Sequence, residues 1–179
     1  MFERPVPPYG ETEELVVLVR NGPATRFLGA DGKYSGIEQD LLELFAKDTS
    51  MRLRLVERSK FNEILPALRR HLAHLAAAGL VATEARREQF TFGPAYLSVH
   101  MVVAYNTENP RPKNVRDLIG KRVVALAGSS GAEQLRLEVA QAPKLTWEEI
   151  PASDSMELLD RLAVDEVDYV VTDSNIVEL

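Results

Sequence analysis

Residues 64–79, ILPALRRHLAHLAAAG, and residues 158–173, LLDRLAVDEVDYVVTD, repeat one pattern. In each segment an amphipathic helix runs into a short apolar strand. Leu68 of the first segment coincides with Leu162 of the second when both are aligned from their first residues. This repeat predicts two similar α/β lobes. Because ligands of open α/β sheets bind at the carboxyl ends of strands, we expect a ligand held between the lobes.

The rest of the chain gives the same order of elements, strand–helix–strand–helix–strand, on each side of one linker. The linker is NTENPRPK at residues 106–113, which contains two prolines and no other apolar residue. Before the linker we expect strands at residues 15–19, 53–56 and 75–78 and helices at 37–47 and 61–70. After the linker we expect strands at residues 122–126, 145–150 and 167–171 and helices at 130–140 and 155–163.

This order predicts an α/β fold of two lobes, each with an open βαβαβ sheet. We expect a mobile N-terminal segment at residues 1–13, a first lobe at 14–104, a hinge at 105–113 and a second lobe at 114–179. Residues 21–36 are expected to form a loop. The alternative is one α/β domain with two unrelated βαβ units, since flavodoxin-like folds share the order.

The composition is typical of a soluble globular protein and disfavours several classes of function. The chain has 179 residues, of which 45% are hydrophobic, and a net charge of −6. This acidic balance disfavours nucleic acid as a partner. No apolar stretch approaches the roughly 20 residues of a membrane-spanning helix, so none is expected. Since the chain has no cysteine, it has no disulfide, thiolate metal site or thiol nucleophile.

Four side chains follow strand ends and can bind a charged ligand. Arg86 comes seven residues after Gly79, where a guanidinium fork can bind a carboxylate bidentately and contribute about 1.5–3 kcal/mol. Ser129 and Ser130 offer hydroxyls beside free backbone N–H groups at a helix start. Asp173 ends an apolar strand and can accept an ammonium. Each has a plainer role as a solvated or capping residue. Together they place a carboxylate receptor and an ammonium receptor on opposing lobes, which matches a zwitterionic ligand.

Other chemistries have little support in the sequence. His71 and His74 have no third ligand at a suitable spacing, so no metal and no cofactor are expected. The chain has no G-x-S-x-G nucleophile motif, no phosphate-binding P-loop and no GxGxxG, and no carboxylate pair is placed for glycoside hydrolysis. We therefore do not expect this chain to be an enzyme.

Several segments resemble a known family. DGKYSGIEQDLLELFAK, FNEILPALRR, AAAGLVATEARREQFTFGPAY and VDYVVTDSN are similar to the family 3 extracellular solute-binding proteins. The combination of aGL-x-x-T-x-x-R with the following segment FGPAY, which together end at Tyr96, is specific to them. The resemblance covers the chain from Leu15 onward and implies a type 2 periplasmic-binding-protein fold.

The resemblance also implies ligand-binding roles. The position of Arg86 clamps the ligand carboxylate, helped by those of Ser129 and Ser130, and the position of Asp173 accepts the amino group. The position of Phe61 packs on the ligand. The full set of ligand-binding residues that the resemblance implies is Asn21, Phe61, Gly79, Val81, Arg86, Ser129, Ser130 and Asp173.

The sequence departs from the family pattern at three places. Val81 stands where transport receptors usually have Ser or Thr, so one hydroxyl for the carboxylate is lost, and His74 replaces an Asp at the start of a strand. The aromatic residue that the family usually has shortly after the first strand is displaced here, with Arg26 and Phe27 nearby. These departures fit a sensor domain of altered specificity or one whose pocket has decayed.

Three segments resemble, more specifically, the N-terminal module of lytic murein transglycosylases: FGPAYLSVHMVVAY, PKLTWEE and ELLDRLAVDEVDYVVTDSN. This implies a periplasmic, outer-membrane-associated protein in which the module binds an amino-acid-like or muropeptide ligand and regulates a C-terminal catalytic domain. The alternatives are an amino-acid receptor of an ABC transporter and a spacer without a ligand. Because the family returns to its first lobe after the second, we expect the C-terminal return to be missing.

Overall fold

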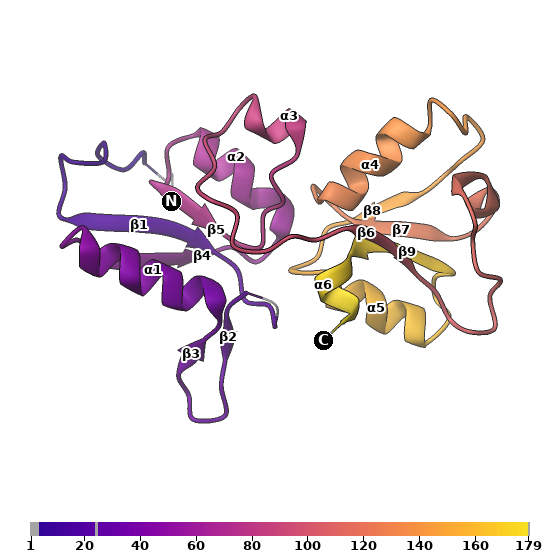
Figure 1. Ribbon diagram of the computed structural model, residues 1–179, viewed down its shortest axis with the longest axis horizontal. Coiled ribbons are helices and arrows are strands. Elements are labelled where there is room, and N and C mark those ends of the chain that lie inside the picture. Colours follow the sequence, from indigo (N-terminus) through magenta and orange to yellow (C-terminus); the bar gives the residue numbers. More distant parts are fainter. Residues whose placement is uncertain (1–3, 24, 179) are drawn as a thin grey trace. The chain divides into compact units, whose positions relative to one another are not determined.

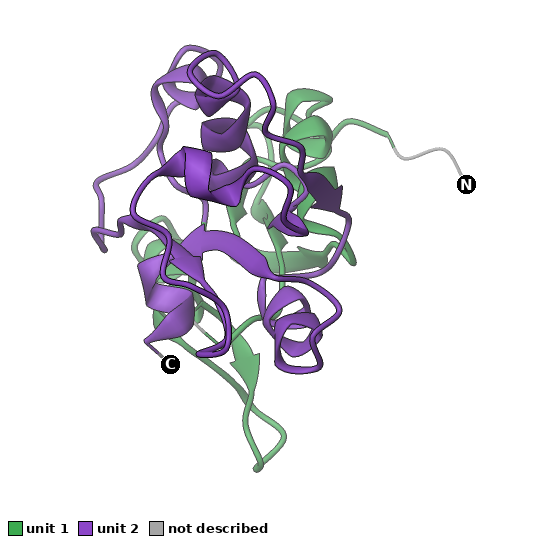
Figure 2. Cartoon of the chain, turned by 90° about the vertical axis from the view of Figure 1, so that its right-hand side faces the viewer, with its two compact units in different colours: residues 1–79 green, residues 80–179 purple. Residues whose placement is uncertain are grey.

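The computed structural model describes residues 4–23 and 25–178; the first three residues of the N-terminal segment expected to be mobile lie outside them. Internal contacts divide the chain into unit 1, which ends at Gly79, and unit 2, which begins at Leu80 (Figure 2). This division differs from the predicted hinge at 105–113, which stays a prediction. Each unit is described by itself.

Unit 1 is a parallel sheet with helices on both faces (Figure 1). Its strand order is β4-β1-β5. Every residue from Leu15 to Val19 is buried, which requires cover on both faces of the sheet. The elements that give the βαβαβ order are β1 (Glu14–Val19), α1 (Ile37–Asp48), β4 (Arg52–Glu57), α2 (Ile64–Arg69) and β5 (Leu75–Ala77).

Two local predictions for unit 1 need correction. The expected loop at 21–36 contains a short hairpin of β2 (Phe27–Leu28) and β3 (Tyr34–Ser35). The expected helix at 61–70 starts as a 3₁₀ turn, η1 (Phe61–Glu63), before α2 begins. Pro66 therefore lies in the first turn of α2, where the backbone N–H that proline lacks has no helical partner in any case, so it does not kink the helix.

Helix α1 buries a different face from the one that its large apolar residues indicate. Leu42 and Ala46 pack against β1, with Glu38 and Gln39 also buried. The large apolar residues that remain exposed on this helix are Ile37, Leu41, Leu44 and Phe45.

Unit 2 is a mixed sheet in the order β6-β9-β7-β8. Strand β6 pairs antiparallel with β9, while β9, β7 and β8 are parallel, and α4 and α5 lie on opposite faces (Figure 1). The elements of unit 2 are α3 (Glu84–Arg87), β6 (Met101–Ala104), η2 (Val115–Leu118), β7 (Val123–Leu126), α4 (Ser130–Glu138), β8 (Glu148–Ile150), α5 (Met156–Ala163), β9 (Tyr169–Asp173) and α6 (Ser174–Val177).

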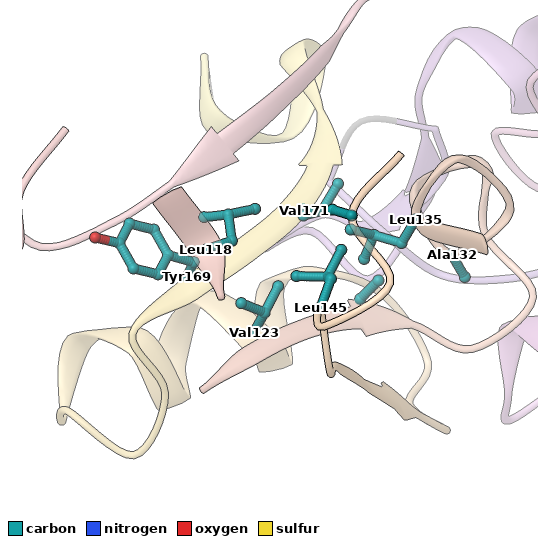
Figure 3. Packing of buried hydrophobic residues seen from close by; sticks show 9 residues of the cluster. Leu118, Val123, Ala132, Leu135, Leu145, Tyr169 and Val171 are labelled. Atoms are coloured by element: carbon teal, nitrogen blue, oxygen red, sulfur yellow. The ribbon is translucent and has the colours of Figure 1, made fainter. Parts of the chain in front are cut away.

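The core of unit 2 lies between the sheet and α4 (Figure 3). Its labelled members are Leu118, Val123, Ala132, Leu135, Leu145, Tyr169 and Val171. The predicted strand at 145–150 is shorter than expected, because Leu145 packs into this core and β8 begins only at Glu148. The Tyr169 hydroxyl donates to the Pro110 carbonyl at 2.8 Å, and burial raises the pKa of Tyr169. None of the helices in the described ranges has the length and apolarity needed to cross a membrane.

Helix α4 approaches β9 so closely that its second residue must be glycine. A Cβ on Gly131 would lie 2.8 Å from the Val171 carbonyl oxygen, which is backbone and cannot swing away. We therefore predict that Gly131→Ala destabilises the protein by about 1–3 kcal/mol through overpacking. Thermal unfolding checks this against Gly93→Ala, where a Cβ meets nothing within 4 Å. Equal melting temperatures for the two variants would contradict the packing described.

Asp168, just before β9, is hydrogen-bonded to Arg122, just before β7, and so links the starts of these two strands. Its Oδ1 accepts from Arg122 Nη2 at 2.6 Å and its Oδ2 from the Arg122 backbone N–H at 2.7 Å. The Arg122 side-chain hydrogen bond lowers the pKa of Asp168 below its ordinary value. Stability from this group is present above the unfolded pKa of about 4 and is lost as the pH falls through the folded pKa.

Asp168→Asn is accordingly expected to be less stable than the parent at pH 7, and the difference should vanish in acid. Urea unfolding at pH 7 and at about pH 3 measures both differences. Asp160→Asn, on an exposed position of α5, serves as the control and should change stability little at either pH. A difference for Asp168→Asn that is as large in acid as at neutrality would refute the ion pair as its cause.

Candidate functional site

The carboxyl ends of β7 and β9 meet at the start of α4, since the two strands are parallel neighbours. The Ser129 hydroxyl caps the helix by accepting from the Ala132 N–H at 3.2 Å. The Ser130 hydroxyl lies 3.0 and 3.1 Å from the two carboxylate oxygens of Asp173. The structure thus brings three of the predicted site residues together, and the serine orients the carboxylate at the end of β9.

Arg86 lies in unit 2, where it is the most enclosed of the predicted charged residues, with 3% of its side chain exposed. It is on the short helix α3, which Thr83 caps. Its Nη1 donates to the Val81 carbonyl at 3.0 Å and its Nη2 to the Gly128 carbonyl at 2.9 Å. The guanidinium therefore connects the segment after β5 to the turn that starts α4.

Glu133 completes this group, although no pattern in the sequence singled it out. Its Oε1 accepts from Arg86 Nε at 2.7 Å and its Oε2 from the Thr83 hydroxyl at 2.8 Å. The signal that could have found it is the position of an acidic residue in the first turn of a helix, where the helix dipole favours negative charge. Its pairing with Arg86 depends on tertiary structure and has no signature in the sequence.

This group, Thr83, Arg86 and Glu133, is a carboxylate bound by a guanidinium and a hydroxyl. The Glu133 side chain is 25% exposed, so the pair lies at the edge of the interior. A hydrogen bond between charged groups of this kind contributes about 1.5–3 kcal/mol. Val81 takes part through its backbone carbonyl, and its side chain supplies no hydroxyl, as the sequence indicates.

In unit 1 the predicted residues lie among buried arginines. Asn21 Oδ1 accepts a hydrogen bond from Arg26 Nη1, and the Arg20 guanidinium lies 5.1 Å from the Phe61 ring centroid. The Gly79 N–H donates to Glu38 Oε1 at 2.9 Å. Arg20, Arg26 and Glu38 are all buried, and none of them was singled out from the sequence as a site residue.

Position 79 has no room for a side chain and has a backbone conformation that favours glycine. Its φ is +64°, and a Cβ would lie 3.0 Å from the Thr25 methyl and 3.3 Å from Arg20 Nη2. The backbone that follows β5 is therefore held close to the buried Arg20.

The two histidines have structural roles. His74 Nδ1 accepts from the Val16 N–H at 2.9 Å and its Nε2 lies 2.7 Å from the Pro7 carbonyl. The His71 carbonyl accepts from the Val6 N–H at 2.8 Å, so part of the segment expected to be mobile contacts this corner. In the parts of the chain that the structure describes, no group of three His, Asp or Glu side chains could hold a metal ion.

Comparison with known proteins places these features in context. A family model of the bacterial extracellular solute-binding proteins, family 3, matches residues 15–164. Membrane-bound lytic murein transglycosylase F of Nitrosospira multiformis is 38% identical over 178 residues, which are 99% of this chain and 37% of that protein. The protein of the same name from Methylobacillus flagellatus is 30% identical, over 94% of this chain and 36% of that protein.

Among solved structures, an ancestral arginine-binding protein bound to arginine has a TM-score of 0.79 at 26% identity, over 93% of this chain and 72% of that one. An ancestral arginine-binding protein bound to glutamine has a TM-score of 0.77 at 25% identity, over 92% and 71%. These likenesses confirm the expected α/β fold class of the type 2 periplasmic-binding proteins. The chain spans little more than a third of the length of the curated relatives named above.

Proposed function

Because the chain belongs to the bacterial extracellular solute-binding proteins of family 3, we propose that it binds a small amino-acid- or peptide-like ligand as the sensing module of a lytic murein transglycosylase. Catalysis in that protein belongs to the region of the relatives that this chain does not cover. The names of the relatives suggest a periplasmic, membrane-associated location. The outer membrane is our proposal for that membrane, and fragments of the cell wall there carry free carboxylates and amines.

The observation that carries the proposal is a buried guanidinium that already holds a carboxylate. Arg86 Nε donates a hydrogen bond to one oxygen of Glu133 and the Thr83 hydroxyl donates to the other, so this part of unit 2 has the chemistry of a carboxylate receptor. Backbone carbonyls fix the guanidinium on its other sides, which gives the pre-organisation that tight binding needs. In the proposed complex Arg86 binds the ligand carboxylate.

Asp173 is proposed as the receptor for the ligand amine. It ends a buried strand, and the Ser130 hydroxyl bonded to its carboxylate fixes its orientation. Ser129 supports the turn between them as the cap of α4. Asn21, Phe61, Gly79 and Val81 are proposed as the further ligand contacts that the family resemblance implies.

Regulation would follow from a change in the populations of two conformations. If ligand contacts are made only in a closed state, binding favours that state, with the predicted hinge at 105–113 as the point of bending. The catalytic domain would then sense closure as its signal.

A receptor of an ABC transporter is the second candidate. It is favoured by the likeness to an ancestral arginine-binding protein bound to arginine. Both candidates share the ligand site and differ in the partner that responds to the bound state. A gene found to continue beyond this chain into a transglycosylase domain would support the sensing module over the transport receptor.

Calorimetric titration with L-arginine, L-glutamine and L-alanyl-D-glutamate tests ligand binding directly. We expect at least one of them to bind, and Arg86→Lys to weaken that binding by about tenfold or more, since lysine keeps the charge but not the fork. Arg87→Lys is the matched control, because Arg87 is its exposed neighbour. Thermal unfolding confirms that both variants are folded.

Two results would count against this account. Unchanged affinity in a folded Arg86→Lys variant would remove Arg86 from the ligand site. Absence of binding for all three compounds and for a mixture of soluble muropeptides would favour a spacer without a ligand.

A further inference from the structure

We propose that Glu133 is an internal competitor of the ligand, whose carboxylate occupies the receptor formed by Arg86 and Thr83 and must be displaced before a ligand carboxylate binds there. The inference rests on the proposed function for the identity of the competing group, and it adds a residue that sets affinity and specificity.

The contacts of Glu133 are those expected of a bound ligand carboxylate. Each of its oxygens has its own donor, Oε1 at 2.7 Å from Arg86 Nε and Oε2 at 2.8 Å from the Thr83 hydroxyl. These donors come from α3 and the residue that caps it, whereas Glu133 belongs to α4. A carboxylate that arrived from solution would find the same two donors and the same charge.

The receptor does not depend on Glu133 for its position. Arg86 also donates to the carbonyls of Val81 and Gly128, and Thr83 is held as the cap of α3. An arginine has five N–H donors, so these two bonds and the one to Glu133 leave two N–H directions without a partner among the described residues. The guanidinium therefore stays in place when Glu133 leaves.

Glu133 is the part of the pair that can move. Its side chain is 25% exposed against 3% for Arg86, so water reaches the carboxylate while the guanidinium is enclosed. Glu133 also lies in the first turn of α4, where the helix dipole stabilises the carboxylate after it has left Arg86. Rotation of the Glu133 side chain is thus enough to open the receptor.

One consequence is selectivity. A ligand gains from Arg86 only the difference between its own carboxylate and that of Glu133, so a single weak carboxylate contact gives little net affinity. Ligands with further contacts overcome the competition. Removal of Glu133 should therefore raise the affinity for every ligand whose carboxylate uses this receptor.

Chemical rescue tests the vacated receptor without a cognate ligand. Glu133→Ala should lower the melting temperature in sodium chloride, because it leaves a buried guanidinium without its counter-ion. Exchange of chloride for sodium acetate at equal ionic strength should then restore at least half of that loss. The parent and the control Glu138→Ala, altered near the exposed end of α4, should show no such gain. An acetate effect of the same size in all three proteins would overturn the inference.

Titration of Glu133→Gln with the amino acid or peptide that binds the parent gives the second measurement. The variant should bind it at least tenfold more tightly, about 1.4 kcal/mol, while the decarboxylated analogue should show no gain. Equal or weaker affinity of the variant would also overturn the inference. Absence of binding to both parent and variant would contradict the proposed function instead, while the acetate result still decides whether Glu133 fills a carboxylate receptor.

Discussion

The structure of the candidate site depends on one buried guanidinium. Arg86 joins three separate parts of unit 2, namely the backbone after β5, the turn at Gly128 and the first turn of α4. Without these acceptors an enclosed positive charge would be costly, and with them it fixes the distance between α3 and α4. The same geometry that makes Arg86 stable makes it a receptor for a carboxylate.

The fold brings the polar residues of the candidate site together at the ends of parallel strands. Parallel strands direct their carboxyl ends to one edge of each sheet, so Ser130 and Asp173, 43 residues apart, become hydrogen-bonded neighbours. Gly131 allows α4 to approach β9 closely enough for this contact. Packing requirements and ligand chemistry thus coincide at the start of α4.

Much of this was predictable, and the exceptions have physical reasons. Apolar runs such as Leu15–Val19 identify buried strands, and Ser129 and Ser130 mark the helix start at α4. The pairing of β6 with β9, the Arg86–Glu133 ion pair and the buried Arg20 depend on contacts between distant residues, which local patterns do not encode. Helix α1 shows the same limit, since Glu38 is buried there while Leu44 is exposed.

The central claim is that Arg86 is enclosed and bonded to Glu133 in the protein without ligand. Hydrogen exchange of the arginine Nε–H groups, followed by ¹⁵N NMR spectroscopy, tests it most directly. The account predicts that the Arg86 Nε–H exchanges much more slowly than that of the exposed Arg87, and that this protection falls in Glu133→Ala, which removes the acceptor of the Nε–H. Equally fast exchange of the two arginines, or protection that Glu133→Ala leaves unchanged, would contradict it.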